Sequence, residues 1–322
     1  MVSVNKEAMK LVKQVINESE RLGIEVSELR NGTKIIDMGV NCLGSWEAGV
    51  LFSRINMGNL GRIELIPYQI DGLDLTGVMV HSDQVVTATL ASQIAGWKIK
   101  TKNTSIIGTG PARAQAVVDS DYYFDMTDYR DNNNEAVLCL QTTEIPGEEI
   151  AVEVAKECGI SSENIYLIVA PSASLVGSIQ VAARSVEQTV HKMYEKGFPI
   201  DSITFARGMA PVAPVIDDEL EAMGRINDAL LYGGFSEFWL DCSDSEIEKV
   251  INDLVSKSSK SFGEPFAKLF KEADYDFFKM DKDIHAMAKV IMINQRTGNR
   301  FEAGEIHQDI IRRSYTGRVI KS

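Results

Sequence analysis

The sequence predicts a mixed α/β (α+β) fold in two lobes. A chain of 322 residues is long enough for about two domains. Segments 62–80 and 288–304 alternate apolar and polar residues around a turn, as antiparallel hairpins do, and Asp71–Gly72 is the expected turn of the first. Between these hairpins, apolar runs of strand length alternate with amphipathic helical segments.

The two lobes are predicted to meet near residue 170. An N-terminal α/β lobe then comprises residues 1–170 and a C-terminal α/β lobe residues 171–322. No long Pro/Gly/Ser linker separates them, so discontinuous or interleaved domains are equally compatible with the sequence.

In the first half of the chain, Asn5 is expected to cap a helix that Gly23 ends. A strand follows over residues 33–40 ("TKIIDMGV"), then a glycine-bounded loop over 44–49 ("GSWEAG"). After the first hairpin, residues 83–97 have helical periodicity.

In the second half, short apolar runs predict strands and longer amphipathic runs predict helices. The expected strands are 136–142, 164–170, 201–208 and 236–242. The expected helices are 147–159, 178–191, 217–234 and 245–257. The closing hairpin has its turn at residues 296–299 ("RTGN").

Charge and hydropathy narrow the class of partner. The net charge is −13 and the isoelectric point is about 4.9, which argues against nucleic acid or an anionic membrane as partner. No apolar run approaches the ~20 residues that span a bilayer. The N-terminal segment "MVSVNKEAMKLVKQ" lacks the apolar core of a signal peptide, so a cytoplasmic protein is expected.

The cysteines and histidines show no metal-ligand spacing. They are Cys42, Cys139, Cys158, Cys242, His81, His191, His285 and His307. Neither CxxC nor HxxxH nor HExxH is present, so neither a disulfide framework nor a metal-activated water is expected.

Two glycine- or serine-rich turns follow predicted strands. In "IIGTGPARA", Gly108, Gly110 and Arg113 would suit a phosphate or carboxylate; the alternative is an ordinary strand-to-helix turn with Arg113 on the solvated surface. The turn matches neither a Walker A loop nor GxGxxG, because no Gly-Lys-Ser/Thr follows and Arg113 replaces the third glycine.

The second turn, "IVAPSASLVGSIQ", places Ser174 and Ser178 as caps or hydroxyl donors, and Gly177 would permit close approach of a ligand. Simple helix capping by serine explains the pattern at least as well. No GxSxG elbow is present, so a nucleophilic serine is not expected.

The segment "SIQVAARSVEQTVH" predicts a helix with a polar stripe beside its buried face. At about 100° per residue, Gln180, Arg184, Glu187 and His191 lie within roughly 60° of one another. Such a stripe is expected on the wall of a cleft. The alternative is an exposed Arg184–Glu187 ion pair at i, i+3, worth ~0.3 kcal/mol.

Many segments in one order resemble the archaeal-type methenyltetrahydromethanopterin cyclohydrolases, which methylotrophic bacteria also contain. They include "NGTKIIDMGV", "WEAGVLFS", "AGWKI", "GTGPARA", "NIYLIVAPSASLVGSIQVAARSVE", "APVAPVIDD", "GRINDALLYGG", "PFAKLFKEADYDFFKMD" and "AGEIHQDII". The resemblance covers nearly the whole chain and ends at about Tyr315.

The resemblance implies reversible hydrolysis of 5,10-methenyltetrahydromethanopterin to the 5-formyl compound in methanogenesis or one-carbon oxidation. It also implies two α/β domains side by side with a large pocket between them, a cytoplasmic homotrimer, and no metal or other cofactor. Glu187 and Arg184 match the catalytic pair of the family. The residues assigned to substrate binding are Gln180, Ser174, Ser178, Gly177, Gly108, Gly110 and Arg113.

Those residue types suit the chemistry. Glu187 is expected to accept a proton from the attacking water and to return it to the leaving nitrogen, and Arg184 to orient the carboxylate and the water. Two other functions stay open: a non-catalytic pterin-binding protein, and a nucleotide-binding transferase anchored through the phosphate at "GTGPARA".

Overall fold

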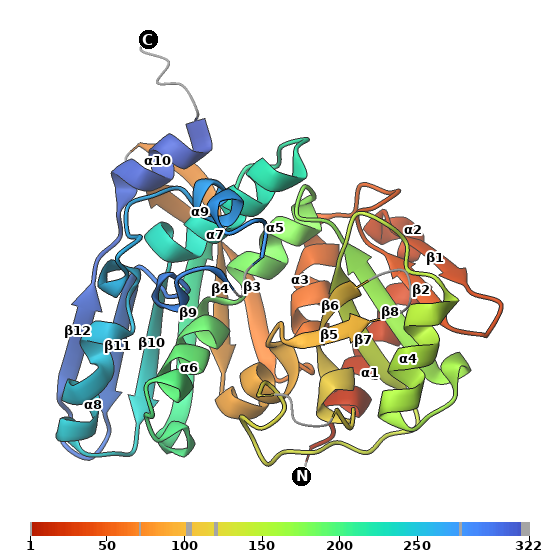
Figure 1. Cartoon of the computed structure of the whole chain (residues 1–322), viewed down its shortest axis with the longest axis horizontal. Coiled ribbons are helices and arrows are strands. Elements are labelled where there is room, and N and C mark those ends of the chain that lie inside the picture. Colours follow the sequence, from red (N-terminus) through yellow and green to blue (C-terminus); the bar gives the residue numbers. More distant parts are fainter. Residues whose placement is uncertain (1, 71, 101–104, 119–121, 277–278, 317–322) are drawn as a thin grey trace. The chain divides into compact units, whose positions relative to one another are not determined.

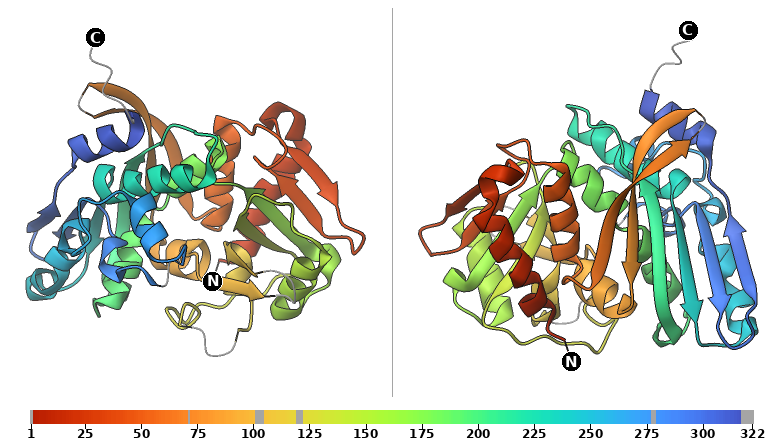
Figure 2. Two further views of the ribbon diagram at one scale, coloured as in Figure 1. Left: turned by 45° about the horizontal axis from the view of Figure 1, so that its top comes forward. Right: turned by 180° about the vertical axis from the view of Figure 1, so that it is seen from behind.

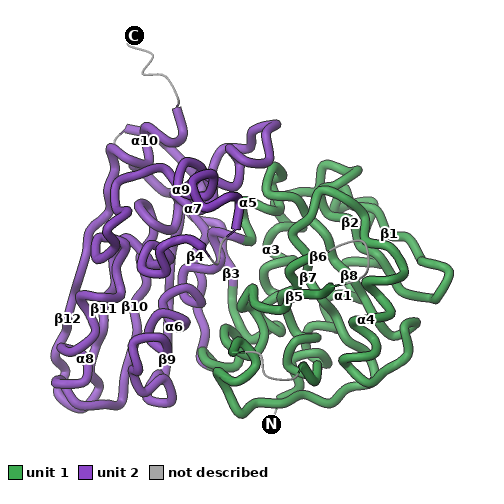
Figure 3. The backbone as a smooth tube through the Cα atoms, viewed as in Figure 1, with its two compact units in different colours: residues 1–62, 84–180 green, residues 63–83, 181–322 purple. Residues whose placement is uncertain are grey.

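The chain forms two compact units, each with its own six-stranded sheet. The computed structural model describes residues 2–70, 72–100, 105–118, 122–276 and 279–316. Unit 1 comprises residues 1–62 and 84–180, and unit 2 comprises residues 63–83 and 181–322 (Figure 3). The α/β class with two sheets is confirmed. The division differs from the predicted boundary at 170/171, because the hairpin 63–83 pairs with strands more than a hundred residues later.

The sheet of unit 1 has the order β1-β2-β8-β7-β6-β5 (Figure 1). Its strands are β1 (Glu25–Glu28), β2 (Lys34–Asp37), β5 (Trp97–Lys100), β6 (Ser105–Thr109), β7 (Ala136–Gln141) and β8 (Ile165–Ala170). The three central strands β2, β8 and β7 are parallel, and β1, β6 and β5 add antiparallel edges. Parallel strands buried on both faces are expected to be apolar, as β8 and the first five residues of β7 are.

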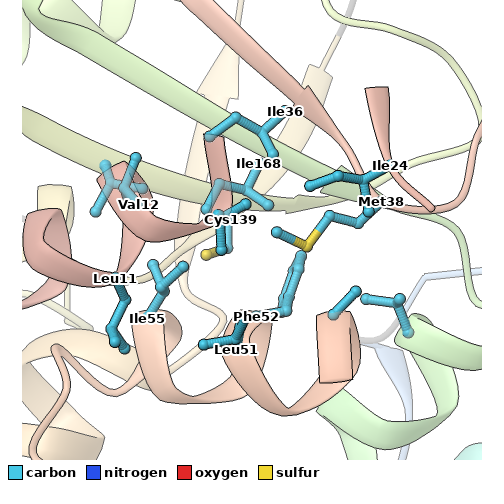
Figure 4. Close-up of a cluster of buried hydrophobic side chains, with 14 of the residues drawn as sticks. Leu11, Val12, Ile24, Ile36, Met38, Leu51, Phe52, Ile55, Cys139 and Ile168 are labelled. Atoms are coloured by element: carbon cyan, nitrogen blue, oxygen red, sulfur yellow. The ribbon is translucent and has the colours of Figure 1, made fainter. Parts of the chain in front are cut away.

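Helices cover both faces of the unit 1 sheet. They are α1 (Val4–Asn17), α2 (Ser19–Leu22), α3 (Trp46–Asn56), the π-helix η1 (Thr87–Gln93), η2 (Pro111–Ala114), α4 (Glu148–Cys158), η3 (Ser162–Asn164) and α5 (Leu175–Ala182). Side chains alternate along β7: Cys139 points into a core with α1 and α3 (Figure 4), whereas Leu138 packs with α4 on the other face. Two apolar cores therefore hold the central strands in place.

The sheet of unit 2 has the order β12-β11-β10-β9-β4-β3. Its strands are β3 (Gly61–Ile70), β4 (Leu73–Ser82), β9 (Ile203–Pro211), β10 (Phe235–Leu240), β11 (Lys289–Asn294) and β12 (Arg300–Gly304). The predicted closing hairpin is confirmed, since β11 and β12 pair antiparallel around residues 295–299. In the first hairpin β3 and β4 are neighbours; of the predicted turn, Gly72 has a φ of 76°, and Asp71 lies outside the described residues.

The helices of unit 2 are α6 (Ser185–Glu195), η4 (Ile200–Ser202), α7 (Glu219–Gly233), α8 (Asp244–Val250), η5 (Ile251–Asp253), η6 (Ser256–Ser258), α9 (Phe266–Glu272), η8 (Lys282–Ile284) and α10 (Gln308–Thr316). In Figure 1, α6 and α8 lie in front of the strands of this sheet, and the view from behind shows those strands on the near side (Figure 2). One face of the sheet is therefore the platform for α6.

Two N-terminal predictions are wrong in detail. Ser3, not Asn5, caps α1 by accepting a hydrogen bond from the Lys6 amide. The Asn5 side chain is buried and bonds the carbonyl of Pro111 and the amide of Val137, because tertiary contacts compete with its capping preference. The predicted glycine-bounded loop 44–49 is largely the first turn of α3, which Ser45 caps.

The predicted helix over 178–191 is also wrong as a single element. It is two helices, α5 and α6, separated by Ala183 and Arg184. The interruption lies a few residues after the point where the chain passes from unit 1 to unit 2. No glycine or proline marks it, so helical periodicity alone does not reveal it.

A buried carboxylate joins three helical segments of unit 2. Asp228 on α7 is 2% exposed; its Oδ1 accepts from the Phe266 amide at 2.9 Å and its Oδ2 from the Ser314 hydroxyl at 2.7 Å. Burial raises the pKa of Asp228 to about 6, and the two hydrogen bonds oppose that shift. The folded state therefore binds this proton more tightly than the unfolded chain does.

Asp228→Asn is expected to change how stability depends on pH. Between the ordinary Asp pKa and about 6 the unfolded chain loses its proton first, so native stability falls as pH rises through this window. From about pH 5 to about pH 7.5, the free energy of unfolding of the native protein should fall by about 1.5 kcal/mol relative to Asp228→Asn. Urea denaturation of both proteins at each pH measures this difference, and parallel pH curves would contradict it.

Candidate active site

The candidate catalytic pair lies at the start of α6, which packs on β9 and β10. Arg184 is the residue preceding the helix and Glu187 is in its first turn, where the helix dipole favours a carboxylate. The helix approaches the sheet closely at Gly208, where an added Cβ would lie 2.5 Å from the Ser185 hydroxyl oxygen. This contact fixes the position of the first turn of α6 on the sheet.

Arg184 and Glu187 form a largely buried ion pair. Arg184 Nη1 donates to Glu187 Oε2 at 3.2 Å, and the two side chains are only 12% and 9% exposed. The alternative of an exposed surface pair is therefore wrong. A pair removed from water keeps more of its electrostatic interaction, and its hydrogen bond fixes the direction of the carboxylate.

Of the other members of the predicted stripe, Gln180 separates from the pair and His191 does not. His191 lies on α6, one turn after Glu187, and its Nε2 is 3.8 Å from Glu195 Oε1. Gln180 lies on α5, before the interruption, and belongs to unit 1. The stripe is therefore carried by two helices, and Arg184, Glu187 and His191 remain together in unit 2.

Unit 1 gathers polar side chains just beyond the carboxyl ends of its parallel strands. Gln141, the last residue of β7, donates through Nε2 to the Ser172 hydroxyl at 2.6 Å, and its Oε1 accepts from Gln180 Nε2 at 3.0 Å. Asp37, the last residue of β2, is buried and accepts from the amides of residues 39–41. Ligands of α/β sheets bind at this end of the strands.

Ser174 and Gly177 shape the turn into α5. The Ser174 hydroxyl accepts from the Gly177 amide at 2.9 Å and donates to the Pro171 carbonyl at 2.8 Å, as in a capped helix. A Cβ on Gly177 would lie 2.0 Å from that carbonyl oxygen, so the chain's own backbone occupies the space beside it. Ser178, one residue later, is 2% exposed.

The "GTGPARA" turn forms a strand end and a four-residue 3-10 helix, η2. Gly110 has a φ of 103°, which favours glycine, and its amide donates to the Ser92 carbonyl at 2.7 Å. A Cβ on Gly108 would lie 2.9 Å from Leu138 in the core. This geometry matches the alternative interpretation, an ordinary strand-to-helix turn. The Gly110 amide is hydrogen-bonded within unit 1.

Arg113 is buried, so the alternative that placed it on the solvated surface is wrong. It is 2% exposed, and its Nη2 donates to the Tyr123 carbonyl at 3.1 Å. Its guanidinium carbon lies 4.8 Å from the centre of the Phe124 ring. Carbonyl and aromatic partners of this kind hold a loop to a core, and they give Arg113 a structural role in unit 1.

Gln141 and Asp37 were missed as candidate residues. Each is the polar residue that ends its strand, in "AVLCLQ" and "KIID". A polar residue at the carboxyl end of a parallel strand is the signal by which both are recognisable.

Metal ligation and a membrane-spanning helix find no support in the described residues. No group of three or more His, Cys, Asp or Glu side chains there is arranged to hold a metal ion. Within the same ranges, every helix is too short or too polar to cross a bilayer.

A cavity of about 280 Å³ lies between α7, α10 and residues 263–267 of unit 2, and Arg225, Asp228 and Arg313 line it.

Comparison with known proteins gives one consistent result. A family model described as cyclohydrolase (MCH) matches residues 3–315. The methenyltetrahydromethanopterin cyclohydrolase of Methanocaldococcus jannaschii is 42% identical over 318 residues, which cover 98% of both chains. The enzyme of the same name from Methanothermobacter marburgensis is 40% identical over 319 residues, covering 98% of this chain and 99% of the relative.

Proposed function

The chain belongs to the cyclohydrolase (MCH) family, and we propose from this membership that it hydrolyses 5,10-methenyltetrahydromethanopterin reversibly to the 5-formyl compound. The relatives that carry this name align over nearly their whole length, which is the observation that supports the assignment most strongly. The reaction hydrolyses one carbon–nitrogen bond of a cyclic amidinium and is a step of one-carbon metabolism.

Glu187 is the general base in this proposal. As water attacks the cationic carbon between the two nitrogens, the Glu187 carboxylate accepts one of its protons. Its negative charge also attracts the cationic substrate before the reaction. Arg184 holds the carboxylate through the 3.2 Å hydrogen bond. The protonated Glu187 then gives its proton to the leaving nitrogen, and the carbon–oxygen double bond forms as the carbon–nitrogen bond breaks.

Gln180 and Ser178 are the proposed substrate contacts from unit 1. Both follow the turn after β8, and the Gln141 amide holds the Gln180 side chain at 3.0 Å. Polar groups that are fixed in this way suit the hydrogen-bonding edge of a pterin ring. Ser174, Gly177, Gly108, Gly110 and Arg113 support the two turns through the contacts described above.

The proposed enzyme acts as a cytoplasmic homotrimer without metal or other cofactor. Helix α6 packs on the sheet face at Gly208 of β9. Phe205, three residues earlier on the same strand, points to the opposite face and is 45% exposed. An exposed aromatic side chain on a sheet face suits a subunit contact. Light scattering should give three times the 35.6 kDa mass of the chain, and the mass of one chain would contradict the trimer.

Loss of the methenyl chromophore tests the proposed function. Purified protein, dialysed against EDTA, should remove the absorbance of methenyltetrahydromethanopterin rapidly. Binding of the pterin without turnover would indicate a non-catalytic pterin carrier. A nucleotide that raises the melting temperature, with no effect of the pterin, would favour the nucleotide-binding transferase.

A further inference from the structure

Titratable side chains form a row along α6 that begins at the proposed base. Glu187, His191 and Glu195 are spaced four residues apart, which places them on one face with neighbouring Cβ atoms about 5–6 Å apart. His191 Nε2 lies 3.8 Å from Glu195 Oε1, and these two side chains are 19% and 20% exposed. The row therefore leads from the more deeply buried Glu187, which is 9% exposed, to groups with more access to water.

The proposed reaction, on which this inference rests, leaves one proton to be released. A cationic amidinium and water give a neutral formyl group, a neutral amine and one proton. Of the two protons of water, the first reaches the leaving nitrogen through Glu187. The second leaves the adduct hydroxyl as the carbonyl forms, and Glu187 accepts it. Since one carboxylate holds one proton, Glu187 must lose this proton before the next turnover.

We propose that His191 and Glu195 carry this proton from Glu187 to solvent, and in the opposite direction when the enzyme forms the methenyl compound. A neutral imidazole accepts a proton at one ring nitrogen and releases one from the other, so no charge accumulates on His191. The transfer makes and breaks only bonds to hydrogen, and Glu187 returns to the carboxylate that the next water requires.

The electrostatic surroundings of His191 suit this role. The charged and titratable groups that act on it come from α6 and from the segment 282–285: Glu187, Lys192, Glu195, Lys282 and His285. Burial lowers the pKa of His191; the Glu187 carboxylate opposes this shift, and Lys192 and Lys282 reinforce it. His191 is therefore neutral at neutral pH and able to accept a proton.

Three titratable neighbours of His191 differ in their states. Lys192 is paired with another carboxylate, His285 is neutral, and Glu195 has a raised pKa. Lys192 is fully buried and donates through Nζ to Asp283 Oδ1 at 2.7 Å, so its ammonium group is paired with this carboxylate. Burial lowers the pKa of His285 to about 4, which keeps that ring neutral as well. Burial raises the pKa of Glu195 and brings it closer to that of His191. Proton transfer between the two then needs less free energy.

Two substitutions of His191 test the relay. His191→Gln keeps a polar side chain of similar length but does not transfer protons, and kcat for hydrolysis should fall at least about tenfold in weak buffer, with little change in KM. His191→Ala should show a similar loss and regain kcat as imidazole is added, because free imidazole replaces the missing ring. Native turnover should not respond to imidazole.

His81→Gln is the matched control, since His81 is an exposed histidine on β4 of the same unit. Melting temperatures of all variants establish that they fold. Unchanged kcat in His191→Gln, or a loss in His191→Ala that neither imidazole nor buffer concentration relieves, overturns the relay while the proposed function stands. A native protein without turnover overturns both.

Discussion

Glu187→Gln is expected to lower kcat for hydrolysis by about 10²- to 10⁴-fold, the range that a general acid–base group contributes. Glutamine has the shape of glutamate and still accepts a hydrogen bond from Arg184, so α6 should keep its position. It cannot take a proton from water, and it no longer attracts the cationic carbon. Loss of the methenyl absorbance under saturating substrate measures kcat directly.

The control for this variant is Glu148→Gln, which changes an exposed glutamate in the first turn of α4. Its kcat should equal that of the native protein. Equal rates for Glu187→Gln and the native protein would leave the cyclohydrolase assignment intact and remove Glu187 from the role of base.

Arg184→Met is expected to lower the free energy of unfolding by about 3 kcal/mol, because it leaves the buried Glu187 carboxylate without its arginine. The double variant Arg184→Met/Glu187→Gln should regain most of that loss, since no unpaired charge then remains in this place. Urea denaturation of the two single variants and the double variant gives the coupling free energy of the pair. Strict additivity would mean that the two side chains do not stabilise each other.

Arg184→Lys separates charge from geometry. Lysine keeps the positive charge but lacks the planar fork of the guanidinium, so the carboxylate is held less firmly. We expect a loss in kcat of about tenfold with a smaller loss of stability than in Arg184→Met. If Arg184→Lys has native kcat, charge alone suffices and the orienting role of Arg184 is excluded.

Elements that a local pattern determines were predicted well. β8 and the first five residues of β7 are uninterrupted apolar runs, and α7 lies within the predicted helix 217–234. The Arg184–Glu187 pair is also local, because residues three apart in the first turn of a helix meet each other. Its burial was not predictable from the spacing.

Features that depend on distant contacts were predicted poorly. The interruption between α5 and α6 carries no helix-breaking residue, and Arg113 is buried because Phe124 and carbonyl groups elsewhere in unit 1 surround it. Likewise, Gly177 has the composition of a ligand-approach site, but the Pro171 carbonyl fills the space beside it. In each case the residue types fit both the structure expected from the sequence and the structure observed. Only the packing of other segments distinguishes the two.

The placement of β3 and β4 in unit 2 has a consequence during synthesis on the ribosome. These strands are complete at Ser82, but β9, the partner of β4, begins at Ile203. At roughly 5–20 residues per second, the hairpin waits about 6–24 s for that partner. A two-stranded hairpin alone is only marginally stable, so its apolar side chains stay exposed while unit 1 is being made. The nascent chain therefore passes through an interval in which a holdase chaperone, or rapid translation of residues 84–203, would limit its aggregation.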